Sequence, residues 1–318
     1  MIAMKWQSVL ASLERSDFTT AERDVDQELA HTPLDADGMM LRGVIKLAQG
    51  RIGEAEEDLW RALAIAPGLG GVRDALGDLF VHDMTEPSPE RDFSLASGER
   101  QTATSLVGIR EDHRCRYEFA ALWLRDRLTP AHRTTGIDLF CGNGYGSRML
   151  ADLAGCRVVG VDGSAEAVAQ ASQAYADHRV VFRQAYFPFE LASRSLDFAV
   201  SLESVEHVAD CDAFLVALDQ AVRGPIVLSF PLENTLKFEI NADLFSYHFR
   251  HFTLEEMTEK LARLCRRKIS AIRGQVVYQL RDGRLNGYVP TARMCLTPLR
   301  SDSQFAVIVA ETDPSLSA

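Results

Sequence analysis

The hydrophobic and polar positions of the chain follow one period before residue 84 and another after residue 134. In residues 1–83, small and apolar side chains recur at helical spacing, and the pattern repeats after 34 residues. The repeated positions end in a helix-stopping proline: Ala21, Val25, Leu29 and Pro33, then Ala55, Leu59, Leu63 and Pro67. Alanines let helices approach closely, so the repeat predicts about two helical hairpins and a closing helix over residues 74–81.

Beyond residue 134, β-rich apolar runs alternate with stretches of helical pattern. The runs end at Phe140, Asp162, Gln184, Leu202 and Phe230. Helical signals follow the first two runs, over residues 147–154 and 165–175, and Ser164 is placed to cap the second helix. This alternation predicts a doubly wound α/β sheet.

Composition separates the two patterned regions. Residues 84–98 are rich in Pro and Ser and indicate a linker, and residues 99–128 have a helical pattern that ends before Pro130. We therefore expect four parts in chain order: a helical repeat domain (1–83), a linker (84–98), an α/β domain (99–312) and a disordered tail (313–318).

Charge and cysteine content narrow the function classes. The net charge is −11, and residues 1–90 account for −9 of it, with 8 Lys and Arg against 17 Asp and Glu. An acidic region of this kind argues against nucleic acid as a partner. No apolar run reaches the ~18 residues of a membrane span. The six cysteines have no disulfide-like or metal-like spacing, so we expect a reduced, cytoplasmic protein.

A glycine-rich loop follows the first strand of the predicted sheet. Gly142, Gly144 and Gly146 occupy alternate positions, where the backbone can turn sharply and lie close against a ligand. The next strand ends in Asp162, whose carboxylate can accept both hydroxyls of a ribose. The loop and this carboxylate together predict a nucleoside-binding site.

The G-x-G-x-G spacing, with Asp138 before it, resembles motif I of class I S-adenosylmethionine-dependent methyltransferases. The resemblance implies a seven-stranded sheet of six parallel strands and one antiparallel strand, with residues 275–280 and 305–310 as a final hairpin. It also implies S-adenosylmethionine as cofactor. The residues expected to hold this cofactor are Asp138, Gly142, Asn143, Gly144, Asp162, Gln184 and Glu203.

Three ionisable residues follow the fourth strand of the sheet. Glu203, Glu206 and His207 have the spacing of one face of a helical turn. One interpretation makes His207 a general base that takes a proton from a hydroxyl, with the two glutamates beside it.

A second interpretation treats the same three residues as ligands of one divalent cation. Their E-x-x-E-H spacing resembles metal-dependent O-methyltransferases, in which a further histidine comes from a later loop. His248 has the matching offset, and the resemblance implies Mg²⁺ or Mn²⁺ held by Glu203, Glu206, His207 and His248. The sequence leaves both interpretations open.

The stretch from His113 to Ala120, the Cys141–Ser147 loop and the Glu203–Val208 segment look like bacterial methyltransferases of surface-polysaccharide assembly. The N-P-P-[YF] signature of amino-nitrogen methylation is absent. We therefore expect an O-methyltransferase acting on a hydroxyl of a saccharide or polyol. The alternatives are methylation of a phenolic small molecule or of an RNA 3′ terminus, and a non-catalytic interaction protein.

The 34-residue period, with Gly43 and Ala62 in place, resembles the tetratricopeptide repeat. The resemblance implies a surface for a protein partner or for self-association. A helical cap that only shields or shapes the α/β domain explains the same pattern equally well.

Overall fold

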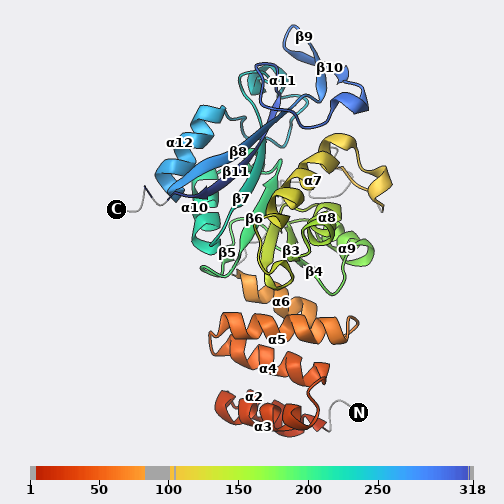
Figure 1. Ribbon diagram of the computed structural model, residues 1–318, viewed down its shortest axis with the longest axis vertical. Coiled ribbons are helices and arrows are strands. Elements are labelled where there is room, and N and C mark those ends of the chain that lie inside the picture. The colour runs from red at the N-terminus through yellow and green to blue at the C-terminus, as the bar shows by residue number, and fades with distance from the viewer. Residues whose placement is uncertain (1–4, 83–100, 104, 314, 316–318) are drawn as a thin grey trace.

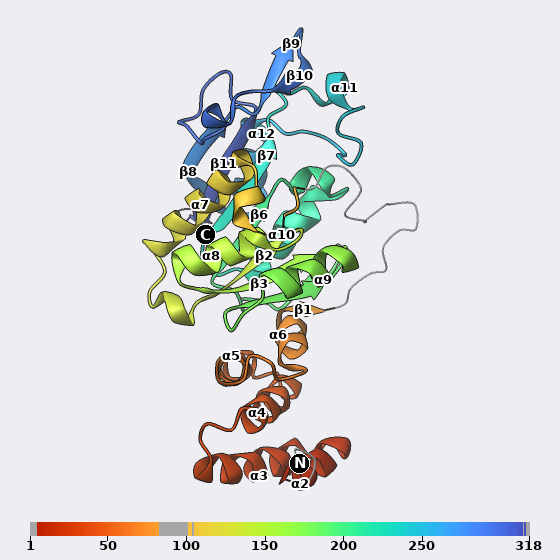
Figure 2. The same cartoon turned by 90° about the vertical axis from the view of Figure 1, so that its right-hand side faces the viewer.

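A computed structural model describes residues 5–82, 101–103, 105–313 and 315. The predicted linker at 84–98 and most of the predicted tail lie outside the described residues. A stack of helices forms one end of the elongated molecule and an α/β part forms the other, as two perpendicular views agree (Figures 1 and 2). Among the described residues, no helix has the length and apolar character needed to cross a bilayer.

The N-terminal end is built from successive helices that each pack on the next. They are α2 (Gln7–Glu14), α3 (Phe18–His31), α4 (Ala36–Ala48), α5 (Ile52–Ile65) and α6 (Val72–Phe80). Ala21, Ala55 and Ala62 are fully buried, and a Cβ at Gly43 would lie 2.8 Å from the Leu59 side chain. The small residues of the 34-residue pattern therefore stand where helices approach most closely.

The α/β part contains a seven-stranded sheet of order β4-β3-β2-β6-β7-β11-β8. Its strands are β2 (Thr135–Leu139), β3 (Arg157–Asp162), β4 (Val180–Gln184), β6 (Phe198–Leu202), β7 (Ile226–Pro231), β8 (Arg267–Gln275) and β11 (Phe305–Thr312). The first five are parallel, and β11 runs antiparallel to both of its neighbours. The predicted fold class is confirmed.

One strand of the predicted final hairpin was misplaced. Residues 275–280 were expected to pair with β11, but its partner is β8, with Gln275 opposite Phe305 at one end. The chain then leaves the sheet and forms a separate hairpin, β9 (Tyr278–Arg281) and β10 (Arg284–Tyr288). Because β8 is an edge strand with charged residues such as Lys268 and Arg273 exposed, it lacks the apolar run that marks a buried strand.

Helices cover both faces of the sheet. On one face lie α7 (Glu111–Arg125), α8 (Tyr145–Ala154) and α9 (Ala165–Ala174), and α10 (Cys211–Ala221) and α12 (Leu254–Cys265) lie on the other. Ser164 caps α9 through a side-chain hydrogen bond, as predicted, and Thr253 caps α12 in the same way. The short helix α11 (Phe238–Asn241) and the β9–β10 hairpin lie beyond the end of β7 (Figure 1).

The helical stack is joined to the sheet by apolar and polar contacts. Leu79 and Phe80 of α6 belong to the same hydrophobic core as Val181 of β4. After α6, β1 (Val81–His82) pairs with β5 (Glu190–Leu191). The Thr135 hydroxyl, at the amino end of β2, donates to Glu56 of α5. The apolar core therefore continues from the helical stack into the α/β part without a gap.

Candidate active site

A cavity of about 800 Å³ opens at the carboxyl ends of the parallel strands. In doubly wound sheets this edge is where ligands bind. Among the described residues, its walls come from the loops after β2, β3, β4 and β6, from α7, from the segment before α12 and from the β9–β10 hairpin.

The three glycines of the loop after β2 have different roles. Gly142 has φ +57° and lines the cavity, and a Cβ built there would meet no atom within 4 Å. A Cβ at Gly144 would lie 2.5 Å from Phe182, and one at Gly146 would lie 2.0 Å from the Tyr117 ring. Gly142 therefore leaves room for a ligand, whereas the other two permit close packing against β4 and α7.

Asp162 lies beside this loop at the end of β3. Its carboxylate accepts hydrogen bonds from the Gly142 and Ser164 backbone N–H groups, both at 2.9 Å. The side chain is 4% exposed and lines the cavity. These bonds fix the carboxylate and the glycine loop relative to each other, in the place predicted for the ribose contact.

Four of the predicted cofactor residues do not line the cavity: Asp138, Asn143, Gly144 and Gln184. Asp138 is fully buried beneath the loop, where it accepts from the Ser147 hydroxyl at 2.7 Å and the Tyr117 hydroxyl at 3.2 Å. Burial raises the pKa of Asp138 to about 7. Asn143 is turned away and donates to the Ala103 carbonyl. Asp138 and Asn143 therefore shape the loop from behind.

Glu203 lines the cavity at the end of β6, with backbone φ +51°. A left-handed conformation is unfavourable for a residue with a Cβ and is typical of functional sites. The Glu203 carboxylate accepts from the Ser229 hydroxyl at 2.7 Å and lies 3.3 Å from the Arg116 guanidinium. Burial raises the pKa of Glu203, and Arg116 opposes this shift.

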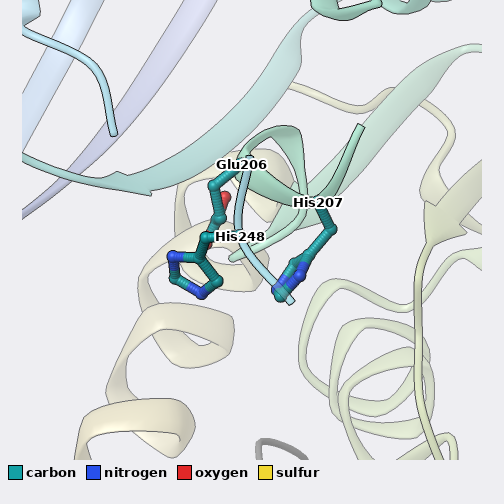
Figure 3. A group of neighbouring side chains, drawn as sticks. All are labelled: Glu206, His207 and His248. Atoms are coloured by element: carbon teal, nitrogen blue, oxygen red, sulfur yellow. The ribbon is translucent and has the colours of Figure 1, made fainter. Parts of the chain in front are cut away.

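Glu206, His207 and His248 come together, although they belong to two separate segments (Figure 3). One potential ligand atom from each lies within 4.8 Å of the others. The centres of the His207 and His248 rings are 4.6 Å apart, and the rings meet edge to face. Burial, followed by the nearby His207 and His251, lowers the pKa of His248 to about 2, so that ring stays neutral. Glu203 is not part of this group.

The loop geometry explains why Glu203 is separated from the other three. The predicted helical turn is a short 3₁₀ turn, Val205–His207, and it begins after the left-handed Glu203. The i, i+3, i+4 spacing therefore does not place Glu203 on the face of Glu206 and His207. Its carboxylate turns to Arg116 of α7 instead.

His113, the first residue of the stretch that resembles polysaccharide methyltransferases, lies in the cavity wall. Its Nε2 is 3.1 Å from Arg110 Nη2, which can only donate, and its Nδ1 is 3.3 Å from the Tyr145 hydroxyl. The proton of neutral His113 is therefore on Nδ1. Burial lowers the pKa of His113 to about 3, despite the nearby Asp112. The ring is therefore a fixed polar part of the cavity wall and does not serve as a base.

An aromatic wall was not predicted from the sequence. Tyr278 and Tyr288 pack with ring centres 5.4 Å apart, and Tyr278 also contacts Phe305. Arg110 stacks over the Tyr288 ring and donates to its hydroxyl at 3.1 Å. These side chains come from four separated segments, so the sequence does not show that they form one wall. The only sequence feature that points to the wall is the pair of aromatic residues on either side of the Asp282-Gly283 turn.

The sheet order, the glycine loop and the carboxylate at the end of β3 are those of the class I S-adenosylmethionine-dependent methyltransferase fold. Residues 137–224 match a family described as "Methyltransferase domain".

Two mycobacterial relatives carry the name of probable S-adenosylmethionine-dependent methyltransferases. The protein from Mycolicibacterium smegmatis is 31% identical over 137 residues, which are 41% of this chain and 52% of that protein. The protein from Mycobacterium tuberculosis strain H37Rv is 30% identical over 141 residues, 42% of this chain and 50% of that protein. The chain therefore spans about half the length of the curated relatives it matches.

Among solved structures, a complex of the Haloferax volcanii Trm112 methyltransferase activator with a methyltransferase gives a TM-score of 0.47 at 20% identity. The match covers 64% of this chain and 91% of that chain. An S-adenosylmethionine-dependent methyltransferase from Mesorhizobium loti gives 0.46 at 20% identity, covering 61% and 99%.

Proposed function

We propose that the protein transfers a methyl group from S-adenosylmethionine to a hydroxyl of a saccharide or polyol. The observation that carries the proposal is the pairing of two features in one cavity. Open space at Gly142 beside the Asp162 carboxylate suits the cofactor, and the group of Glu206, His207 and His248 suits activation of a hydroxyl.

The residues of the cavity fit each part of the cofactor. Asp162 would accept the ribose hydroxyls. Arg116 and Glu203 form an ion pair. The Arg116 guanidinium suits the carboxylate of the methionyl end, and the Glu203 carboxylate suits its ammonium group. Tyr186 and Phe187, after β4, offer faces for the adenine. When bound, the cofactor supplies an activated methyl group, and the protein aligns the acceptor with it.

His207 is the proposed base in the metal-free route. Its Nδ1 lies 3.1 Å from the Tyr247 carbonyl oxygen, which can only accept, so neutral His207 carries its proton on Nδ1 and its lone pair on Nε2. In the alternative route, Glu206, His207 and His248 hold a divalent cation such as Mg²⁺ or Mn²⁺, which would lower the pKa of the acceptor hydroxyl. Glu203 is not a ligand in this version.

The charge of the cavity supports a neutral acceptor. Among the described lining residues, five carboxylates (Asp112, Asp162, Glu203, Glu206 and Asp210) stand against two guanidinium groups (Arg110 and Arg116). A polyanionic acceptor would be repelled, whereas a polyhydroxyl acceptor finds hydrogen-bond partners. The aromatic wall also suits the apolar faces of sugar rings, and it favours a phenolic small molecule as the second candidate acceptor.

For the helical stack we propose a tetratricopeptide-like docking role for a protein partner or a second copy. The support is the acidic charge of residues 1–90 and the helix-on-helix packing. We also propose that the protein acts in the cytoplasm, because all six cysteines are free thiols.

Labelled methyl transfer tests the proposed activity. Wild-type protein is incubated with labelled S-adenosylmethionine and panels of saccharides, polyols and phenols, before and after chelation of metals. We expect a saccharide or polyol to accept label, and His207→Ala to lose most of the rate while still binding S-adenosylhomocysteine. If only phenols accept label, the acceptor is a phenol and not a saccharide or polyol. Loss on chelation, restored by Mn²⁺, would select the metal route.

A further inference from the structure

His251 is a buried histidine that the proposed reaction does not use directly. It is 3% exposed and packs against the Phe238 and Phe245 rings. Its Nδ1 lies 2.6 Å from the Leu236 carbonyl oxygen. A carbonyl oxygen can only accept, so the proton of this hydrogen bond belongs to His251 Nδ1.

The other ring nitrogen of His251 contacts His248. His251 Nε2 and His248 Nδ1 are 2.9 Å apart, a distance at which one of them carries the proton. A charged imidazolium would be strongly disfavoured in this aromatic enclosure, where a carboxylate oxygen of Glu233 lies no closer than 4.0 Å to His251 Nδ1. Neutral His251 has its lone pair on Nε2, and His248 Nδ1 must therefore donate.

This chain of two hydrogen bonds has a consequence for the cavity. With its proton on Nδ1, neutral His248 has its lone pair on Nε2. His207 reaches the same state through the Tyr247 carbonyl. Separate hydrogen bonds thus hold both imidazoles in the tautomer that can bind a metal through Nε2, and both rings lie beside the Glu206 carboxylate.

We propose that His251, held by the Leu236 carbonyl, is a positioning residue that fixes the tautomer of His248, so that His248, His207 and Glu206 bind a divalent transition-metal ion. This inference deepens the metal route of the proposed function. Hydrogen bonds from metal-binding histidines to second partners commonly serve this purpose. The stacking of Phe245 on His248, with ring centres 4.7 Å apart, holds the ring plane as well.

The donor set selects among cations. Two imidazole nitrogens and one carboxylate oxygen favour Co²⁺, Zn²⁺ or Fe²⁺ over Mg²⁺, which prefers oxygen ligands. This differs from a magnesium site built mainly from carboxylates, which would need Glu203, and Glu203 is engaged with Arg116 and Ser229. We therefore expect Co²⁺ to bind more tightly than Mg²⁺.

The test combines nitrogen NMR with Co²⁺ titration and needs no acceptor. In metal-free wild type, ¹⁵N shifts and couplings are expected to show His248 protonated on Nδ1. His251→Phe removes the accepting nitrogen, and we expect Co²⁺ affinity to fall by about 10–100-fold. His251→Gln, whose amide oxygen can accept from His248, should recover part of that loss.

Binding of S-adenosylhomocysteine serves as the control for folding and for the cofactor site. If it is unchanged while Co²⁺ affinity falls, the proposal is supported. A wild-type His248 protonated on Nε2, or equal Co²⁺ affinity in wild type and His251→Phe, overturns it. Failure of wild type to bind Co²⁺ or Zn²⁺ also overturns it but leaves the metal-free methyltransferase intact. If His251→Phe does not fold, the wild-type spectrum and the His251→Gln titration still decide.

Discussion

At the scale of single residues, identical residue types in one motif have different physical roles. Gly142 and Gly146 are both part of the G-x-G-x-G loop, but one faces the cavity and the other faces the Tyr117 ring. Two aspartates next to this loop differ in the same way. Asp162 lines the cavity, whereas Asp138 supports the loop from within the core. These differences predict separable effects on ligand binding and on stability.

Replacing Gly146 by alanine should destabilise the fold. The added Cβ would lie 2.0 Å from the Tyr117 ring, and overpacking of this kind costs about 1–3 kcal/mol. Urea unfolding measures the change.

Replacing Gly142 by alanine should act mainly on the ligand. Its Cβ meets no protein atom, so the stability loss should be limited to the roughly 1–2 kcal/mol of a left-handed alanine. Calorimetry should show weaker S-adenosylhomocysteine binding. The distinction between the two glycines would be wrong if Gly146→Ala were the variant that lost only ligand affinity.

At the scale of elements, the β9–β10 hairpin adds the aromatic wall to an otherwise ordinary sheet. This region of the molecule was not predicted from the sequence, whereas other elements were. Buried strands such as β4 were located from their apolar runs, and the cap of α9 from local chemistry. The edge strand β8 was missed because its exposed charges hide the strand pattern, and the wall was missed because residues distant in sequence build it.

Tyr288→Ala should weaken acceptor binding without affecting the cofactor. The side chain lines the cavity and accepts a hydrogen bond from Arg110. For the acceptor that supports turnover, we expect KM to rise about 10-fold, as for loss of roughly 1.4 kcal/mol of binding. S-adenosylhomocysteine affinity should not change. Leu280→Ala, on the same hairpin but outside the cavity wall, is the matched control. Equal KM values for the two variants would mean that the hairpin is not part of the acceptor site.

At the scale of the whole molecule, the helical stack and the sheet share one hydrophobic core. In the sequence, strand ends locate Gly142, Asp162 and Glu203, and a family resemblance groups His248 with Glu206. Only the assembled fold turns Glu203 away from that group and toward Arg116. The contact between α5 and β2 is likewise invisible in sequence. There, burial raises the pKa of Glu56 to about 7, although Thr135 and Arg157 oppose the shift.

Glu56 should make stability depend on pH. Its folded pKa is raised above its unfolded value, so its contribution is fully present below about pH 4.5 and is lost as pH rises through about 7. From pH 6 to pH 8, the unfolding free energy of wild type should fall more than that of Glu56→Gln. Urea titrations at several pH values measure this, and parallel pH profiles would contradict it.

The central claim is that the glycine loop and Asp162 hold S-adenosylmethionine. Calorimetric titration with S-adenosylhomocysteine tests it most directly, on wild type, Asp162→Ala and the control Asp152→Ala, whose carboxylate pairs with Arg148 on α8 outside the cavity. We predict micromolar binding by wild type and the control, and its loss in Asp162→Ala with the fold retained. Absence of binding by folded wild type, or unchanged affinity in Asp162→Ala, would contradict the claim.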